Sequence, residues 1–246
     1  LYDRVIQALG QCQIQYVELG GVEPNPKLSL VRKGVALCKR EKVELVLAVG
    51  GGSTIDSAKA IAVGACCDAD PWEFSSKRLT PERALPVGTI LTLAASGSEM
   101  SSSAVITNED GLLKRGYNSD FNRPLFSILN PKLTYTVSKF QTGCGIVDIM
   151  MHTLERYFTL STDVDLSDRL AEGLLQSVIR AGRVAIDHPE DYEARATLMW
   201  AGSLSHNDLT GAGRQVSLDV HQLEHELSGM YDFVAHGAGL SVLFPA

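Results

Sequence analysis

The chain has 246 residues, of which 45% are hydrophobic and 21% charged, so it has the composition of a globular protein and not of a disordered, collagen-like or coiled-coil chain. Its formal net charge of −7 argues against a nucleic-acid surface, because phosphate contacts need clustered Lys and Arg. No uncharged apolar run approaches the roughly 18 residues that span a bilayer. The cysteines are odd in number and irregularly spaced, which is typical of free thiols in a reducing cytoplasm. We therefore expect a cytoplasmic protein that binds neither nucleic acid nor membranes.

The first half of the chain alternates helical and strand-like patterns. We expect helices at 1–9, 26–41 and 53–63, and strands at 15–19, 43–49, 85–95, 103–107 and 125–129. The nearly continuous apolar run at 43–49 is typical of a buried strand in a parallel sheet. Segment 111–124 is the most loop-like. The order of strands and helices predicts right-handed βαβ units and an open, mostly parallel sheet.

The second half is helical throughout, with apolar periodicity over 138–160, 165–186, 189–204 and 216–231. We therefore expect an α/β domain over residues 1–137 and an all-helical domain over 138–246. The chain begins inside a helical pattern with no strand before it, and it ends on the apolar run GLSVLFPA. These ends predict that the chain is a segment of a longer protein.

A glycine-rich segment, Gly50-Gly51-Gly52-Ser53, lies between the apolar strand and the next helix. Glycines let the backbone approach a phosphate, and the free N–H groups of a helix N-terminus attract anions. Ser53 could cap this helix and bond a phosphate oxygen. The segment matches neither G-x-G-x-x-G nor a P-loop, so a tight turn is the alternative. Inside the helix, Asp56 could face a ligand, and we expect Lys59 to be solvated.

A second polar loop, Thr92 to Glu99, follows the next buried strand and is rich in small and hydroxyl residues. Ligands of open α/β sheets lie outside the carboxyl ends of the strands. Two such loops would flank one crevice, which favours the phosphate interpretation over a simple turn.

Asp148 and His152 share one face of an apolar helical segment because they are i and i+4. Burying both is costly without a partner, and a divalent cation is one such partner. A plain Asp–His hydrogen bond is the alternative. His221 and His225 repeat the spacing, and His236 follows in an expected loop. One carboxylate with several imidazoles suits Fe(II), Zn(II) or Ni(II) and not Ca(II).

The remaining histidines, His188 and His206, are expected at the surface or as helix caps. Residues 221–225 read HQLEH, a literal H-x-x-E-H inverted zinc-protease signature with Glu224 as base. So short a pattern often occurs by chance, and a protease would leave both polar loops and the Asp148–His152 pair without a role.

Six strings spread over nearly the whole chain resemble the iron-containing (group III) alcohol dehydrogenases, especially the NADP-dependent butanol dehydrogenase and broad-range aldehyde reductase branch. They are AVGGGSTIDSAKAIA, DPW, LTLAASGSE, GIVDIMMHTLERY, DRLAEG and HQLEHELSGMYDFVAHGAGLSVLFPA. The resemblance implies an α/β dinucleotide-binding, Rossmann-like domain followed by an all-α, dehydroquinate synthase-like metal-binding domain. It also implies that the first strand of the α/β domain and the C-terminal part of the helical domain are missing from this chain. It also implies hydride transfer between NADP(H), or NAD(H), and a small aldehyde or primary alcohol, and we expect a homodimer.

The same resemblance implies roles for individual residues. One divalent metal, Fe(II) or Zn(II) with Ni(II) as a further candidate, would be held by Asp148, His152, His221 and His236. His225 would relay a proton, with a packing histidine as the alternative. The segment from His225 to His236 holds one residue more than the family's usual run, which would displace His236.

For the cofactor, the resemblance points to both polar loops and one lysine. The expected cofactor-binding residues are Gly50, Gly51, Gly52, Ser53, Asp56, Thr92, Leu93, Ser96 and Lys114. Two other functions are kept as alternatives: an inactive fragment that only binds, and the H-x-x-E-H protease.

Overall fold

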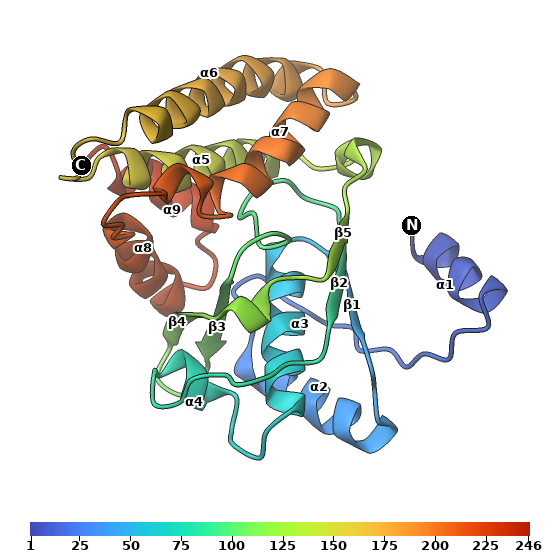
Figure 1. The fold of residues 1–246 in the computed structure, drawn as a ribbon. Coiled ribbons are helices and arrows are strands. Elements are labelled where there is room, and N and C mark those ends of the chain that lie inside the picture. The colour runs from blue at the N-terminus through green and yellow to red at the C-terminus, as the bar shows by residue number, and fades with distance from the viewer.

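The computed structural model describes residues 1–246, which form a sheet-containing half and a helical half (Figure 1). Three parallel strands make the sheet in the order β1-β2-β5: β1 (Val46–Gly50), β2 (Val87–Leu91) and β5 (Phe126–Ile128). Val46 pairs with Val87 and Gly50 with Leu91, so β1 and β2 end side by side. The expected parallel sheet is confirmed, and the two polar loops leave its carboxyl edge together.

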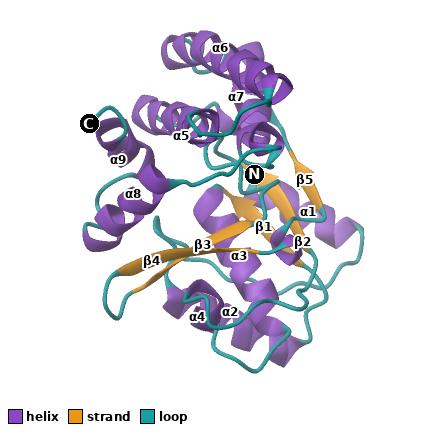
Figure 2. Cartoon of the chain, turned by 60° about the vertical axis from the view of Figure 1, so that its left-hand side comes forward, coloured by secondary structure: helices purple, strands orange, loops and turns teal.

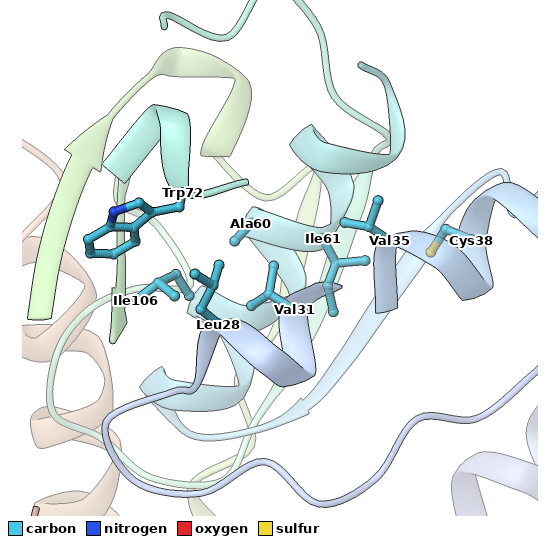
Figure 3. Close-up of a cluster of buried hydrophobic side chains, with 8 residues drawn as sticks. All are labelled: Leu28, Val31, Val35, Cys38, Ala60, Ile61, Trp72 and Ile106. Atoms are coloured by element: carbon cyan, nitrogen blue, oxygen red, sulfur yellow. The ribbon is translucent and has the colours of Figure 1, made fainter. Parts of the chain in front are cut away.

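Helix α3 (Gly52–Ala65) is buried between the sheet and helix α2 (Leu28–Glu41). On one face, Ile55 packs in a cluster with residues of β1 and β2. On the other, Ile61 packs against Val31 and Val35 of α2 (Figure 3). Burial on both faces explains why the α3 sequence is apolar nearly all round.

A separate antiparallel hairpin, β3 (Ser103–Asn108) and β4 (Leu113–Asn118), extends toward α8 (Figure 2). The expected loop at 111–124 is therefore wrong over β4. The polar sequence of this strand hides its pattern, because Lys114 and Tyr117 are both buried. The expected strand at 15–19 is also wrong, since no strand pairs with it.

The second half consists of helices, as expected. They are α5 (Lys139–Tyr157), α6 (Asp165–Asp187), α7 (Tyr192–Ser205), α8 (Asp219–Met230) and α9 (His236–Leu243). Ser138 caps α5 through Gln141 N, and Asp191 caps α7 through Ala194 N. A core around Ile149 and Leu198 joins α5, α6 and α7. Helix α9 was not expected, because the sequence predicted a loop at His236.

The remaining elements are short or peripheral. They are α1 (Tyr2–Gln11), α4 (Trp72–Ser75) and three 3₁₀ turns, η1 (Asp120–Asn122), η2 (Pro131–Thr134) and η3 (Leu209–Gly211). Helix α1 buries none of its residues and stands apart from the rest in Figure 1. None of the helices is long and apolar enough to cross a membrane.

Candidate metal and cofactor site

A cavity of about 930 Å³ lies between the two halves. Most of the expected site residues line it: Gly52, Ser53, Asp56, Leu93, Ser96, Lys114, Asp148, His152, His221, His225 and His236. Gly50, Gly51 and Thr92 are not in its wall. The cavity thus brings the loops of the sheet half and the histidines of the helical half into one space.

The four expected metal ligands converge around one carboxylate oxygen. Oδ1 of Asp148 lies 3.2 Å from Nδ1 of His152 and 3.6 Å from Nε2 of His221. Nε2 of His236 is 3.7 Å from the same oxygen. The ligand atoms of Asp148, His152 and His221 all lie within 4.8 Å of one another, whereas His236 groups in this way with Glu224 and His225. Helix α5 supplies Asp148 and His152, whereas α8 and α9 bring His221 and His236 to them.

The Nδ1 atom of each of the three histidines faces a hydrogen-bond acceptor. Nδ1 of His152 lies 3.0 Å from the main-chain oxygen of Asp148. Nδ1 of His221 contacts the carboxylate of Glu155, and Nδ1 of His236 contacts the carboxylate of Glu224. An Nδ1–H that donates to such a group leaves Nε2 as the free ligand atom of the neutral imidazole.

Two buried atoms at the centre of this cluster have no hydrogen-bond partner, Oδ1 of Asp148 and Nε2 of His221. Unpaired buried polar atoms are costly, and a cation between them would satisfy both. Carboxylate and imidazole donors also suit Fe(II) or Zn(II). The residues present therefore fit a divalent metal.

Burial sets the charge state of the histidines. It lowers the pKa of His152 and of His225 well below the ordinary histidine value, so both are neutral at pH 7. At His221 burial is outweighed by the nearby carboxylates of Asp148 and Glu155, which raise its pKa to about 9. A metal bound at Nε2 would release that proton.

His206 is the C-cap residue of α7, as one of the two expectations had it, but it is half-buried in the cavity wall beside the cluster and not exposed at the surface. Its ring centroid is 4.1 Å from that of His152, and Arg156 donates to its Nδ1 over 3.2 Å. Burial lowers its pKa well below the ordinary value. The sequence hides this position because α7 ends at Ser205 and turns back toward α5. His188, in contrast, is exposed at the end of α6 as expected.

The glycine segment forms the turn between β1 and α3. Gly51 precedes the first helical residue, Gly52, so the expectation that Ser53 caps α3 is wrong: it is the second residue of the helix. A side chain on Gly52 would clash with Oγ of Ser96, and one on Gly51 would come within 3.3 Å of Leu93. The two polar loops therefore pack directly against each other, and glycine is required for that approach.

Asp56 and Lys59 are both committed to protein contacts within the sheet half. Asp56 accepts from Ser98 Oγ over 2.5 Å and from Val105 N over 3.1 Å. Lys59 was expected to be solvated, but it is fully buried and donates to the main-chain oxygens of Ser101 and Ser103. These acceptors lie more than 40 residues away along the chain, so the local sequence does not reveal them, and their hydrogen bonds offset the cost of burying the lysine.

Lys114, expected near the cofactor, contributes to the cavity wall but is also buried. Its Nζ donates to Oδ1 of Asn25 over 2.9 Å and to Oγ of Ser228 over 2.8 Å, and it lies 3.6 Å from Oε2 of Glu224. Its contacts thus join β4 to α8. Sequence reasoning missed this arrangement because it assigned 111–124 to a loop.

Three residues of the site were not predicted from the sequence: Glu155, Glu224 in this role, and Arg156. The signal for Glu155 was its place on the α5 face of Asp148 and His152, one turn further along. Glu224 was considered only as the base of an H-x-x-E-H protease. That interpretation is wrong, because Glu224 is fully buried and holds His236.

The chain was compared with known families and proteins. Residues 1–131 match the family described as iron-containing alcohol dehydrogenase, and residues 142–246 match the C-terminal part of the Fe-containing alcohol dehydrogenase family. NADH-dependent butanol dehydrogenase A of Clostridium acetobutylicum is 45% identical over 245 residues, which cover 100% of this chain and 63% of that protein. The NADPH-dependent aldehyde reductase YqhD of Escherichia coli is 38% identical over 249 residues, with 99% and 63% covered.

Among solved structures, NADH-dependent butanol dehydrogenase A of Thermotoga maritima superposes with a TM-score of 0.97 at 43% identity. The match covers 99% of this chain and 61% of that one. The chain thus spans less than two thirds of the length of the relatives it matches. Fold, sequence and family patterns agree, and the chain belongs to the iron-containing alcohol dehydrogenase family.

Proposed function

We propose that the chain is the metal- and cofactor-binding part of an oxidoreductase that transfers a hydride between NAD(P)H and a small aldehyde or primary alcohol. The metal ligands in this proposal are Asp148, His152, His221 and His236. The observation that carries it is the convergence of three imidazoles on the unpaired Oδ1 of Asp148, in a cavity that also reaches the N-terminus of α3. The names of the relatives support the reaction class.

The chain's own residues would bind and orient the cofactor and would exchange a proton with the substrate. The turn before α3 offers main-chain N–H groups and the Ser53 hydroxyl to a pyrophosphate. When bound, the nicotinamide supplies the hydride and a divalent cation the Lewis acid that polarises the carbonyl. His225 would exchange the alcohol proton, since it is neutral and its ring lies 5.3 Å from that of His236 in the cavity wall.

Membership of the family does not determine which metal and which nicotinamide cofactor the chain binds, so we propose one of each with an alternative. We propose Fe(II), with Zn(II) as the alternative, because an imidazole-rich site with one carboxylate suits both. For the cofactor we propose NADP(H), on the resemblance to the aldehyde reductase branch. NADH is the alternative, since the butanol dehydrogenase relatives carry NADH in their names.

The test is hydride transfer by the purified chain, loaded with Fe(II) or Zn(II), from NADPH or NADH to butanal, followed by loss of nicotinamide absorbance. We expect turnover with metal and none after chelation. His236→Ala should abolish it, whereas His188→Ala, a histidine exposed at the end of α6, should not. Full activity of the metal-free chain would overturn the proposal.

An inactive binding fragment is the second candidate, because the chain spans only 63% of its curated relatives. It predicts that metal and NAD(P)H bind to the purified chain but that no aldehyde is reduced. Fluorescence titration of the reduced cofactor in parallel with the assay separates the two candidates.

A further inference from the structure

Two buried glutamates hold the Nδ1 atoms of the histidines that come from α8 and α9. The Oε2 atom of Glu155 contacts Nδ1 of His221, and its Oε1 accepts from the main-chain N of Val220 over 2.7 Å. Oε2 of Glu224 contacts Nδ1 of His236 and accepts from Ser228 over 3.2 Å. His152 alone uses a main-chain acceptor, because its partner lies one turn back on the same helix.

We propose that Glu155 and Glu224 are positioning residues of the metal site, and that Lys114 holds Glu224 in place. A carboxylate at Nδ1 fixes the ring's orientation and its tautomer, and it increases the basicity of Nε2. This inference rests on the metal site of the proposed function and concerns how two of its ligands are held.

The geometry around Glu224 leaves it little freedom to turn away. It is fully buried, and a side chain on Gly239 of α9 would come within 2.9 Å of its Cγ and Oε1 atoms. Lys114 places a positive charge 3.6 Å from Oε2, which offsets the cost of burying the carboxylate. Because Lys114 belongs to β4, the sheet half thereby supports a ligand that the helical half provides.

Lys114 is in turn held by the segment before α2. Its Nζ donates to Oδ1 of Asn25, and Nδ2 of Asn25 donates to Oδ1 of Asp232 over 3.1 Å. Asp232 lies in the connection from α8 to α9, four positions before His236 in the sequence. A chain of contacts thus runs from Asp232 through Asn25 and Lys114 to Glu224, which holds His236.

The proposal is tested with Co(II), whose visible spectrum reports ligand number and geometry. Metal-free wild type, Glu224→Gln and Glu224→Leu are titrated with Co(II) and their folding checked by circular dichroism. Glutamine keeps an acceptor oxygen for Nδ1–H, whereas leucine keeps only the bulk. We expect Glu224→Leu to lose about 10- to 100-fold in Co(II) affinity with a changed spectrum, and Glu224→Gln to lose less.

Glu193→Gln is the matched control, since Glu193 is exposed on α7 and does not line the cavity, and its Co(II) affinity should stay within about threefold of wild type. Glu155→Gln and Glu155→Leu repeat the comparison at His221, so a Glu224 variant that fails to fold leaves the proposal testable. Lys114→Met should weaken Co(II) binding, as Glu224→Leu does.

Wild-type Co(II) affinity and spectrum in folded Glu224→Leu and Glu155→Leu would overturn the proposal. If wild type itself bound no Co(II), the metal site would fail, and this inference would fail with it.

Discussion

Nδ2 of Asn25, in the segment before α2, donates a hydrogen bond to Oδ1 of Asp232, 3.1 Å away in the connection between α8 and α9. Nζ of Lys27 lies 2.5 Å from the same oxygen. The hydrogen bond from Lys27 and that from Asn25 favour the ionised carboxyl, so the pKa of Asp232 lies below its ordinary value. This pair of residues ties the two halves together at the edge of the site.

The link predicts a specific pH dependence of stability. Because the folded pKa is below that of an unfolded aspartate, the contribution of Asp232 is present above about pH 4 and is lost as the pH falls through the folded pKa. Asp232→Asn should cost only about 0.5 kcal/mol at pH 7, since Asp232 is 57% exposed and the pair is screened. Urea unfolding of both proteins should show this difference shrinking toward pH 3. A difference that grew on acidification would contradict the assignment.

The unpaired Oδ1 of Asp148 predicts that metal stabilises the fold. With metal at about a hundredfold excess over its dissociation constant, the free energy of unfolding should rise by about 2.7 kcal/mol. Asp148→Asn keeps the shape of the side chain but removes the charge that attracts a cation. Thermal unfolding with and without Zn(II) should therefore show a shift in wild type and little or none in Asp148→Asn. Asp3→Asn, exposed on α1, is the control and should shift as wild type does.

Lys59 gives a second pH signature, with the same sign as that of Asp232 but in the alkaline range. Burial lowers its pKa to about 8, against the attraction of Asp56 and Glu99. Between pH 8 and the ordinary lysine pKa of about 10.4, the unfolded chain binds a proton that the folded chain does not, so stability gains with rising pH. Lys59→Met lacks this gain, and it removes the donor to two main-chain oxygens and the charge that attracts Asp56 and Glu99, which should cost about 3 kcal/mol at pH 7.

The measurement is denaturant unfolding of wild type and Lys59→Met from pH 7 to 10. The gap between them should widen above pH 8. Lys33→Met, exposed on α2, should follow wild type at every pH. Parallel curves for wild type and Lys59→Met would mean that Lys59 titrates as an ordinary solvated lysine.

Much of the fold was predictable because local pattern and tertiary role agree. The small residues of α3 are buried on both faces, and the apolar run that becomes β1 packs against them, so the composition of both segments indicates a core position. The fold class and the family resemblance are confirmed. The boundary at residue 137/138, the homodimer, the cytoplasmic location and the assigned site residues stay predictions.

What the sequence did not reveal depends on partners distant along the chain. Lys59 looks like a surface charge until the acceptors at Ser101 and Ser103 are in place. Lys114 was expected only at the cofactor, and its contact with Asn25 was not foreseen. The strand β4 was hidden for the same reason, since its buried residues are polar. Glu224 was visible only as part of a short motif, and its contact with His236 needs the turn from α8 into α9.

The approach of α9 to α5 supplies the last prediction. A side chain on Gly237 would clash with the main-chain oxygen of Cys144, so Gly237 lets His236, the residue before it, lie beside Asp148. Gly237→Ala should destabilise the chain by about 1–3 kcal/mol through overpacking and should weaken metal binding, because α9 must move away. Gly173→Ala, on the exposed face of α6 with nothing within 4 Å of the added carbon, should instead stabilise by about 0.5–1 kcal/mol. Urea unfolding and Co(II) titration of the two variants check both signs, and unchanged metal affinity in Gly237→Ala would show that His236 does not depend on this close packing.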